Sequence, residues 1–219
     1  AFIPDIQILT DYFPNKLPPV FDYVLDNIDD KNIKYMVTLG DLTDENTQEE
    51  WDLVKEQLDR FNGILPYSIF RGNHDGVWKN QPAIYDSIFA DPNSDYYKHV
   101  QANGGFYDTS SVKNTYLLFE EGGTKYMLLN LDYGITDEKI LDWADEVIEA
   151  HPDRRVIVAT HAWLGSHGEP FATGEWSSPG TEVSGSIDPD RIWNEHLSKH
   201  ANIDMIVCGH SQSDQILCT

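Results

Sequence analysis

Short apolar runs alternate with helical patterns along this chain. Apolar runs with the length of buried strands occur at residues 2–3, 35–39, 66–70, 156–160 and 205–208. Apolar residues at helical spacing lie between these runs and predict helices over residues 20–28, 51–61, 140–148 and 192–197. Two further runs, 115–119 and 125–131, flank Glu121-Gly122-Gly123-Thr124 and predict a β-hairpin.

Two segments lack a sustained period. Residues 77–105 are rich in Tyr, Asp, Asn and Pro, and we expect loops there with one short helix over Ile84–Phe89. Residues 164–185 are rich in Gly, Ser and Pro and predict a long loop, a feature that compact domains usually keep for function.

The order of the elements indicates an α/β fold whose hydrophobic strands are covered on both faces. A length of 219 residues fits one domain, and six Trp, eleven Tyr and nine Phe exclude a disordered chain. Only two cysteines occur, Cys208 and Cys218, so the sequence has neither a disulfide framework nor a cysteine-based zinc motif.

The net charge of the chain excludes some classes of binding partner. Fifteen Lys and Arg against 37 Asp and Glu give a formal net charge of −22, which argues against nucleic acid bound along a surface and against docking on an anionic membrane. No apolar run reaches the roughly 18 residues of a membrane-spanning helix, so we expect no membrane insertion. A phosphate-bearing substrate requires a cation that the side chains do not supply.

Polar side chains follow five of the predicted strands. Because ligands bind outside the carboxyl ends of strands in open α/β sheets, these residues are expected to share one crevice. In chain order they are Asp5 and Gln7, Gly40-Asp41, Asn73-His74-Asp75, His161, and Gly209-His210. Singly, each of these has an ordinary structural explanation as a turn, a cap or a core histidine.

The residue types in this crevice suit a metal centre. Asp, Asn and His offer the oxygen and nitrogen donors that bind Mn, Fe, Zn and similar divalent ions. A carboxylate can bridge two such ions at about 3.5–4 Å and hold a water or hydroxide between them. Two divalent ions would also supply the positive charge that a substrate phosphate needs in so acidic a chain.

In this ordered set the chain resembles the calcineurin-like metallophosphoesterases. That family's motifs run Asp-X-His, Gly-Asp-X-X, Gly-Asn-His-Asp/Glu, a single His, and Gly-His-X-His. The corresponding segments here are Asp5-Ile6-Gln7, Gly40-Asp41-Leu42-Thr43, Gly72-Asn73-His74-Asp75, Thr160-His161 and Gly209-His210-Ser211-Gln212. The Asp-X-Gln motif is most similar to the bacterial extracytoplasmic branch, with weaker support from Lys113-Asn114-Thr115-Tyr116 and residues 150–155.

The resemblance implies a four-layer α/β/β/α sandwich with two mixed β-sheets flanked by helices, formed by residues 1–219. That branch usually continues with further strands of the second sheet, so we expect an incomplete domain with an exposed C-terminal edge. It also implies an extracytoplasmic or secreted protein, for which we take a monomer as the default.

The resemblance further implies a role for each motif residue. Asp41 bridges two divalent metal ions, Asp5 and Gln7 bind the first ion, and the second ion is bound by Asn73, His161 and His210. A metal-bridging hydroxide attacks the phosphorus of a phosphomonoester or phosphodiester. Catalysis is assigned to His74 as the general acid and to Asp75, which orients it or tunes its pKa, while Asn73 and His74 bind the phosphoryl oxygens.

Two departures from the family pattern fall on the first metal. Gln7 and Gln212 stand where the family usually has histidine, and a neutral amide oxygen is a weaker ligand than imidazole for Zn or Fe. The first site therefore favours Mn, Mg or Ca, is weakly occupied, or is completed by another residue, such as one of residues 213–215. Gln7 is taken as a ligand, and the role of Gln212 is left open.

Three functions follow from these observations. The first is a metal-dependent phosphoesterase acting on a small phosphate ester. The second is a phosphoesterase-like binding module with a degraded metal centre, and the third is an adhesion or polymer-associated domain of a larger secreted protein. If the protein is an enzyme, further polar and aromatic residues near the motifs either shape its choice of substrate or have only structural roles. These residues are Arg71, His167, Glu169, Glu175, Tyr12, Trp78, Tyr96, Tyr97, Trp163 and Trp176.

Overall fold

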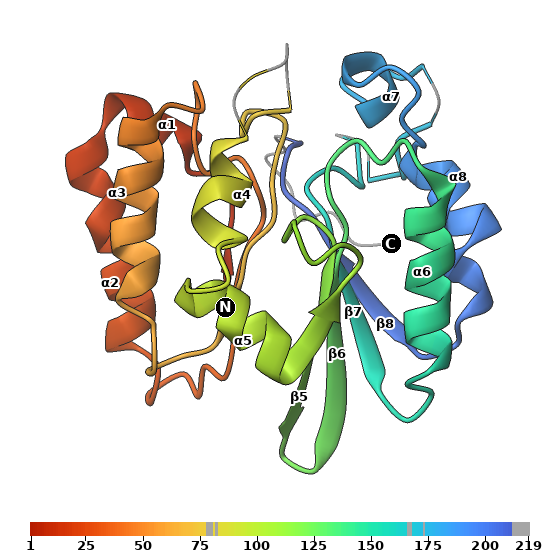
Figure 1. Ribbon diagram of the computed structural model, residues 1–219, viewed down its shortest axis with the longest axis horizontal. Helices are drawn as coiled ribbons and strands as arrows, with labels where there is room; N and C mark the ends of the chain where they lie inside the picture. The colour runs from red at the N-terminus through yellow and green to blue at the C-terminus, as the bar shows by residue number, and fades with distance from the viewer. Residues whose placement is uncertain (78–80, 82, 166–167, 173, 212–219) are drawn as a thin grey trace.

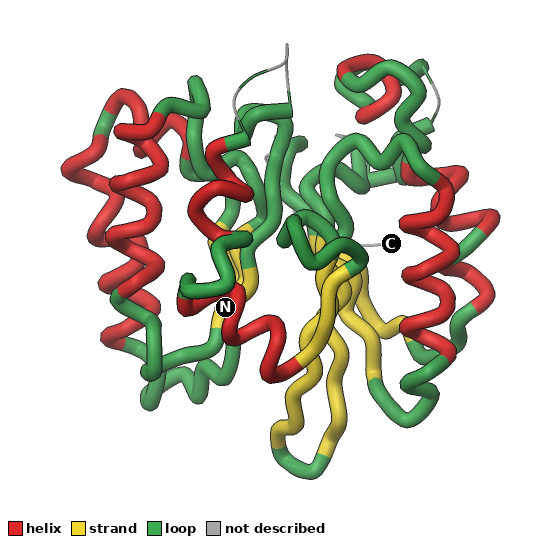
Figure 2. Tube along the Cα trace, in the orientation of Figure 1, coloured by secondary structure: helices red, strands yellow, loops and turns green. Residues whose placement is uncertain are grey.

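The strands of this protein form two sheets between two sets of helices, as a computed structural model shows (Figures 1 and 2). The structure describes residues 1–77, 81, 83–165, 168–172 and 174–211. The expectations for Trp78, His167 and Gln212, and for the C-terminal edge beyond residue 211, lie outside the described residues.

The first sheet has three parallel strands in chain order, β1 (Phe2–Ile3), β2 (Met36–Thr38) and β3 (Tyr67–Ser68). The second sheet is mixed and has five strands in chain order, β4 (Gly104–Phe106), β5 (Thr115–Glu121), β6 (Thr124–Asn130), β7 (Arg155–Ala159) and β8 (Ile203–Val207). Strands β6, β7 and β8 run parallel to one another, so their carboxyl ends lie at one edge of the sheet.

Helices cover the outer faces of both sheets. On one side lie α1 (Gln7–Tyr12), α2 (Leu17–Asp26) and α3 (Gln48–Asp59), and on the other lie α6 (Glu138–Glu149) and α8 (Pro189–Glu195) (Figure 1). The remaining helical segments are η1 (Pro14–Lys16), α4 (Ile84–Phe89), α5 (Asp95–Asn103), α7 (Pro179–Glu182) and η2 (Leu197–Lys199). The predicted fold class is confirmed, since two sheets are flanked by helices in four layers. Only the second sheet is mixed as expected, because the described strands of the first sheet all run parallel. Within the described part of the chain, no helix is long and apolar enough to cross a lipid bilayer.

Strand β6 shows why the sequences of the central strands are continuous apolar runs. Leu128 belongs to the core that lies between the sheets and against α2 and α3. Its neighbours Met127 and Leu129 point to the opposite face and join the core beneath α6 and α8. Because both faces of the strand are buried, the alternation of polar and apolar residues typical of a half-exposed strand is absent.

The predicted helices and strands are present, with boundaries shifted by a few residues. The loops predicted for residues 77–105 are only partly correct, because α5 and β4 also lie in this segment. Helix α5 was missed because its buried residues Tyr96, Tyr97 and Val100 are embedded in polar sequence, although the Ser94 side chain caps it. Helix α1 has only six residues, too few for a recognisable period, and α7 is a single turn inside the predicted loop.

Candidate metal centre

The loops that leave the carboxyl ends of the parallel strands bring the motif residues together. Asp5 follows β1, Asp41 follows β2 and Asn73 follows β3, while His161 follows β7 and His210 follows β8. Strands β1, β2 and β3 run parallel in the first sheet and β7 and β8 run parallel in the second, so within each sheet these carboxyl ends lie at one edge. The two sheets therefore contribute to one site, as the sequence predicted.

Glycines let these loops approach closely. A Cβ atom on Gly72 would lie 2.1 Å from Asp41 Oδ1, and one on Gly209 would lie 2.2 Å from Asp5 Oδ1. Two of the site residues themselves have left-handed backbones, Asp41 with φ of 49° and His210 with φ of 67°. Such conformations are uncommon outside glycine and concentrate at functional sites, because the surrounding structure must hold them.

Four donor atoms from four loops face one another at the centre of the site. His161 Nε2 lies 3.0 Å from Asn73 Oδ1 and 3.2 Å from Asp41 Oδ2. His210 Nδ1 lies 3.0 Å from the same Asn73 oxygen and 3.2 Å from His161 Nε2. His161 and Asp41 are buried, so nothing but a cation or a proton can balance this cluster of lone pairs.

Backbone carbonyls fix which nitrogen of each histidine faces the centre. His161 Nδ1 lies 2.7 Å from the carbonyl oxygen of Leu39, and His210 Nε2 lies 2.9 Å from that of Ser177. A carbonyl oxygen only accepts, so each of these nitrogens carries a proton and donates. The other nitrogens, His161 Nε2 and His210 Nδ1, are thereby left to act as ligands, the usual arrangement of metal-binding histidines.

The charges of the site are strongly coupled. Burial opposes a charged His161, but the Asp41 carboxylate beside it outweighs burial and raises the pKa of His161 to about 9. The same pair lowers the pKa of Asp41, although burial alone would raise it. Burial, together with the charge of His161, lowers the pKa of His210. With no ion bound, a proton on His161 therefore takes the place of a cation between the donors.

Asp5 and Gln7 lie on the other side of Asp41. Both Asp5 carboxylate oxygens face the backbone N–H of His210, at 3.0 and 3.3 Å, and burial raises the pKa of Asp5. Gln7, the first residue of α1, donates from Nε2 to Asp41 Oδ2 at 3.2 Å. All six residues predicted as metal ligands thus lie in one connected cluster.

His74 flanks this cluster and is paired with a residue that the sequence analysis missed. Its backbone N–H donates to Asp41 Oδ1 at 3.0 Å. Its Nδ1 lies 2.9 Å from the carbonyl oxygen of Asp44 and 3.1 Å from the Asp44 carboxylate. The available signal was the position of Asp44 in the loop of the Gly-Asp motif, three residues beyond Asp41.

Asp75 does not lie where we expected it. Its buried carboxylate accepts hydrogen bonds from the backbone N–H groups of Gly72, Leu42 and Thr43 and from the Thr43 hydroxyl. Asp75 thereby ties the Asp41 loop to the Asn73 loop, and Asp44 takes the place beside the His74 imidazole. Burial and the nearby charge of Asp41 raise the pKa of Asp75 to about 6.

The predicted long loop covers one side of the centre. Ser177 contacts His210 through its carbonyl, and the Phe171 ring lies 5.9 Å from the His210 ring. Behind the two histidines, the Tyr133 ring lies 5.7 Å from each of theirs. Of the aromatic residues proposed to line a substrate pocket, Tyr96, Tyr97 and Trp163 are buried in the core, whereas Tyr12 and Trp176 are exposed.

The order and geometry of these motifs agree with a family comparison. Residues 1–214 match the profile of the calcineurin-like phosphoesterases. The chain belongs to this family. The name of this family refers to the hydrolysis of phosphoric esters.

This phosphoesterase domain matches part of a longer curated protein. It is 30% identical over 219 residues to the uncharacterized protein YvnB of Bacillus subtilis, covering 93% of this chain and 15% of YvnB. The chain therefore spans about a seventh of the length of the curated relative it matches.

Two solved structures share the fold. A dimetal phosphatase from Danio rerio has a TM-score of 0.61 at 16% identity, over 96% of this chain and 80% of that one. GAP50, described as the anchor in the inner membrane complex of Plasmodium, has a TM-score of 0.55 at 13% identity, over 96% and 65%.

Proposed function

We propose that this domain hydrolyses a small phosphomonoester or phosphodiester with divalent metal ions bound between its two sheets. The observation that carries the proposal is the group of four donor atoms, Asp41 Oδ2, Asn73 Oδ1, His161 Nε2 and His210 Nδ1, whose neighbouring members lie 3.0–3.2 Å apart. One carboxylate, one amide oxygen and two imidazoles form a donor set that suits Mn, Fe or Zn.

The residues on the two sides of Asp41 give the ions different environments. Asn73, His161 and His210 would hold the second ion, and Asp41 would bridge the two. Asp5 and Gln7 would hold the first, with the Gln7 amide turned so that its oxygen replaces its nitrogen at the centre. Bound ions would activate a water and neutralise the phosphoryl oxygens.

The chain's own residues supply the remaining chemistry. The backbone N–H of His74 donates to Asp41 Oδ1, and the His74 imidazole would protonate the departing alkoxide as general acid. Asp44 contacts the ring at Nδ1 through both its carbonyl and its carboxylate, which would hold the imidazole in place during proton transfer. Asn73 would bind the second ion by its oxygen, and its amide N–H groups would then donate to a phosphoryl oxygen.

A binding module with a degraded metal centre is the second candidate. It is favoured by one contact, the hydrogen bond from Gln7 Nε2 to Asp41 Oδ2, because an amide nitrogen at this position is not a ligand. Metal analysis separates the candidates: two ions per chain support the enzyme, whereas one or none supports the binding module.

The test of the enzyme is turnover of p-nitrophenyl phosphate and bis-p-nitrophenyl phosphate after loading with Mn²⁺, Zn²⁺ or Fe²⁺. We expect His74→Asn to lower kcat by about 10²–10³-fold, the usual effect of removing a general acid. His151→Asn is the matched control, because His151 lies at the end of α6 and contacts Val147. No turnover with any metal, or equal rates for wild type and His74→Asn, would contradict the proposal.

A further inference from the structure

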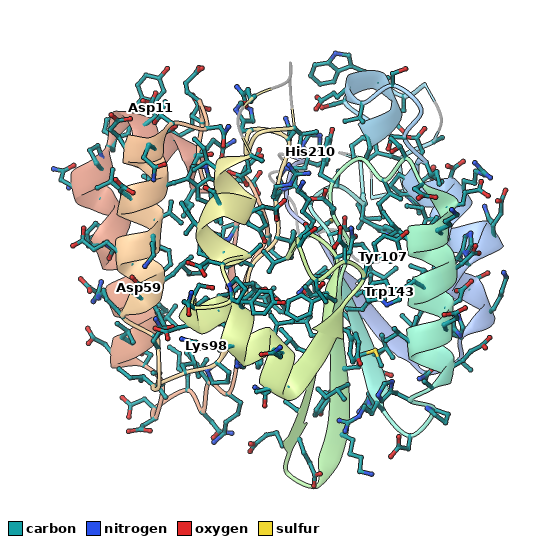
Figure 3. All side chains as sticks on the ribbon, in the orientation of Figure 1. Asp11, Asp59, Lys98, Tyr107, Trp143 and His210 are labelled. Carbon is teal, nitrogen blue, oxygen red and sulfur yellow. The ribbon has the colours of Figure 1, made fainter. Side chains whose placement is uncertain are left out.

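A groove of about 530 Å³ opens beside the metal centre and has no role in the site described above. Gly76 and Tyr133 line the end next to the centre, since Gly76 follows the His74 motif and Tyr133 packs against both metal-site histidines. The groove extends to Tyr107, which lies against Trp143 and is labelled below His210 in Figure 3. Its volume is that of a site for a small organic molecule.

Arg71 gives this groove a fixed polar group. Its guanidinium is largely buried and donates from Nε and Nη2 to the two carboxylate oxygens of Asp132, at 3.0 and 2.5 Å. Asp132 is held in turn, because its backbone N–H donates to Asn114 Oδ1 at 2.9 Å. The geometry is rigid, as expected of a bidentate arginine–carboxylate pair.

The third guanidinium nitrogen is left for a ligand. Arg71 Nη1 has no hydrogen-bond partner among the residues that the structure describes, although Arg71 lines the groove. Arg71 Nη1 is not among the fully buried side-chain atoms that lack a partner in the described part of the chain, so its two N–H groups reach solvent and can donate to a ligand in the groove. A buried ion pair also adds little to stability by itself, which favours a role in binding.

The charge around the groove indicates what kind of acceptor it takes. Lys113, the second cation of the wall, lies 2.9 Å from Asp86. The wall also carries Asp108. Three carboxylates, Asp86, Asp108 and Asp132, therefore outnumber the two cations. A second anionic group would be repelled, whereas hydroxyl groups can accept from arginine or lysine and donate to the carboxylates.

We propose that this groove binds the alcohol portion of the phosphate ester, and that this alcohol is uncharged and rich in hydroxyl groups, such as a sugar or another polyol. The proposal rests on the proposed function, which places the scissile phosphate at the metal centre. Arg71 and Lys113 donate to the hydroxyl oxygens, the carboxylates accept from the hydroxyl protons, and the Tyr107 ring packs against the carbon skeleton.

The test compares two alkyl esters that differ in hydroxyl groups, glucose 6-phosphate and cyclohexylmethyl phosphate. In the metal-loaded protein, Arg71→Lys keeps the charge but removes the planar donor. We expect it to lower kcat/KM for glucose 6-phosphate by about 30-fold, mainly through KM, and that for cyclohexylmethyl phosphate by less than about threefold. Lys113→Gln should show the same selectivity with a smaller loss. The controls are Arg155→Lys and Lys125→Gln, whose side chains form exposed ion pairs with Asp204 and Asp153.

The possible outcomes are distinct. Equal losses of kcat/KM for the two esters in Arg71→Lys, or no loss for either, would overturn the proposal. If Arg71→Lys instead loses more kcat/KM for fructose 1,6-bisphosphate than for glucose 6-phosphate, the groove binds a second anionic group and the proposal of an uncharged polyol is wrong. If the wild type turns over neither these esters nor the nitrophenyl esters, the proposed function fails instead. Calorimetric titration with glucose 6-phosphate then decides the groove by itself. About tenfold weaker binding to Arg71→Lys than to wild type supports the groove, and equal or absent binding refutes it.

Discussion

Single backbone contacts set the chemistry of the side chains at this metal centre. The carbonyls of Leu39 and Ser177 each receive an N–H of one histidine, so that the opposite ring nitrogens face Asn73 and Asp41. The same logic holds for His74, whose Nδ1 is engaged by Asp44. Because such contacts fix both tautomer and orientation, their loss changes the reactivity of a residue that is itself unaltered.

Asp44→Asn tests the residue that holds His74. The substitution keeps the backbone carbonyl but removes the carboxylate 3.1 Å from Nδ1, so the imidazole loses one of the two groups that hold it in place. We expect kcat for p-nitrophenyl phosphate to fall by about tenfold or more in the wild-type background and to change little in a His74→Asn background. Asp11→Asn, an exposed carboxylate of α1, is the control. Equal losses in the wild-type and His74→Asn backgrounds would show that Asp44 does not act through His74.

At the scale of elements, short loops after the strands carry the site, and helix ends hold those loops. The loop after β2 leads into α3, whose N-terminus has a capping box between Thr47 and Glu50. The buried Glu50 carboxylate also accepts from the backbone N–H of Asp44, at 2.8 Å. One side chain thus caps a helix and fixes the segment that positions His74.

Glu50→Gln is expected to destabilise the protein by about 2 kcal/mol, because the amide presents N–H groups to backbone donors and leaves them unsatisfied. Urea unfolding measures the loss. Glu49→Gln removes the same charge from the same turn, but from an exposed position, and should change stability by less than about 0.5 kcal/mol. Equal effects of the two substitutions would mean that charge near the helix end, and not the buried contacts, determines the stability.

At the scale of the whole molecule, the metal donors join the two sheets. Asp41 and Asn73 follow strands of the three-stranded sheet, whereas His161 and His210 follow strands of the five-stranded sheet. Asn130 makes a second link deeper inside, donating from β6 to the Ser68 hydroxyl of β3 at 2.6 Å. An ion bound by donors from both sheets binds only the folded chain and must stabilise it.

Adding Mn²⁺ at about 100 times its Kd should raise the free energy of unfolding by about 2.7 kcal/mol over the chelator-treated protein. The metal must displace the proton of His161, whose pKa is about 9, so the apparent affinity should fall about tenfold per pH unit from pH 8 to pH 6.5. Without metal, the stability of the protein depends on pH in the opposite direction. Protonated His161 stabilises the fold fully below about pH 6.5, and this stabilisation is lost as the pH rises through 9, because the pKa of His161 is raised in the folded state.

Thermal unfolding with EDTA and with Mn²⁺ between pH 6 and 9 measures both trends. His161→Asn, which has no proton to displace, should flatten the dependence on pH. A metal-induced rise in Tm that grows as the pH falls, or no rise at any pH, would contradict this account of the site.

Most of the fold could be predicted from the sequence because the spacing of hydrophobic residues within a helix or strand depends only on neighbouring positions. The helix around Trp51 and the strand around Val158 could be read from neighbouring residues alone, and the motif residues could be placed at strand ends in the same way. Helix α5 escaped because packing of Tyr96 and Tyr97, and not a local period, stabilises it. Tertiary contacts of this kind override weak local signals.

The sequence by itself determined the α/β order of the chain, the family motifs and the six candidate ligands, since each depends on residue type and on spacing over a few positions. Only the tertiary structure decided that Asp44, and not Asp75, holds His74, that two carbonyls orient the histidines, and that Arg71 faces a groove with Asp132 behind it. These pairings join residues up to 122 positions apart, as for Leu39 and His161, and so depend on how loops pack after the sheets have formed.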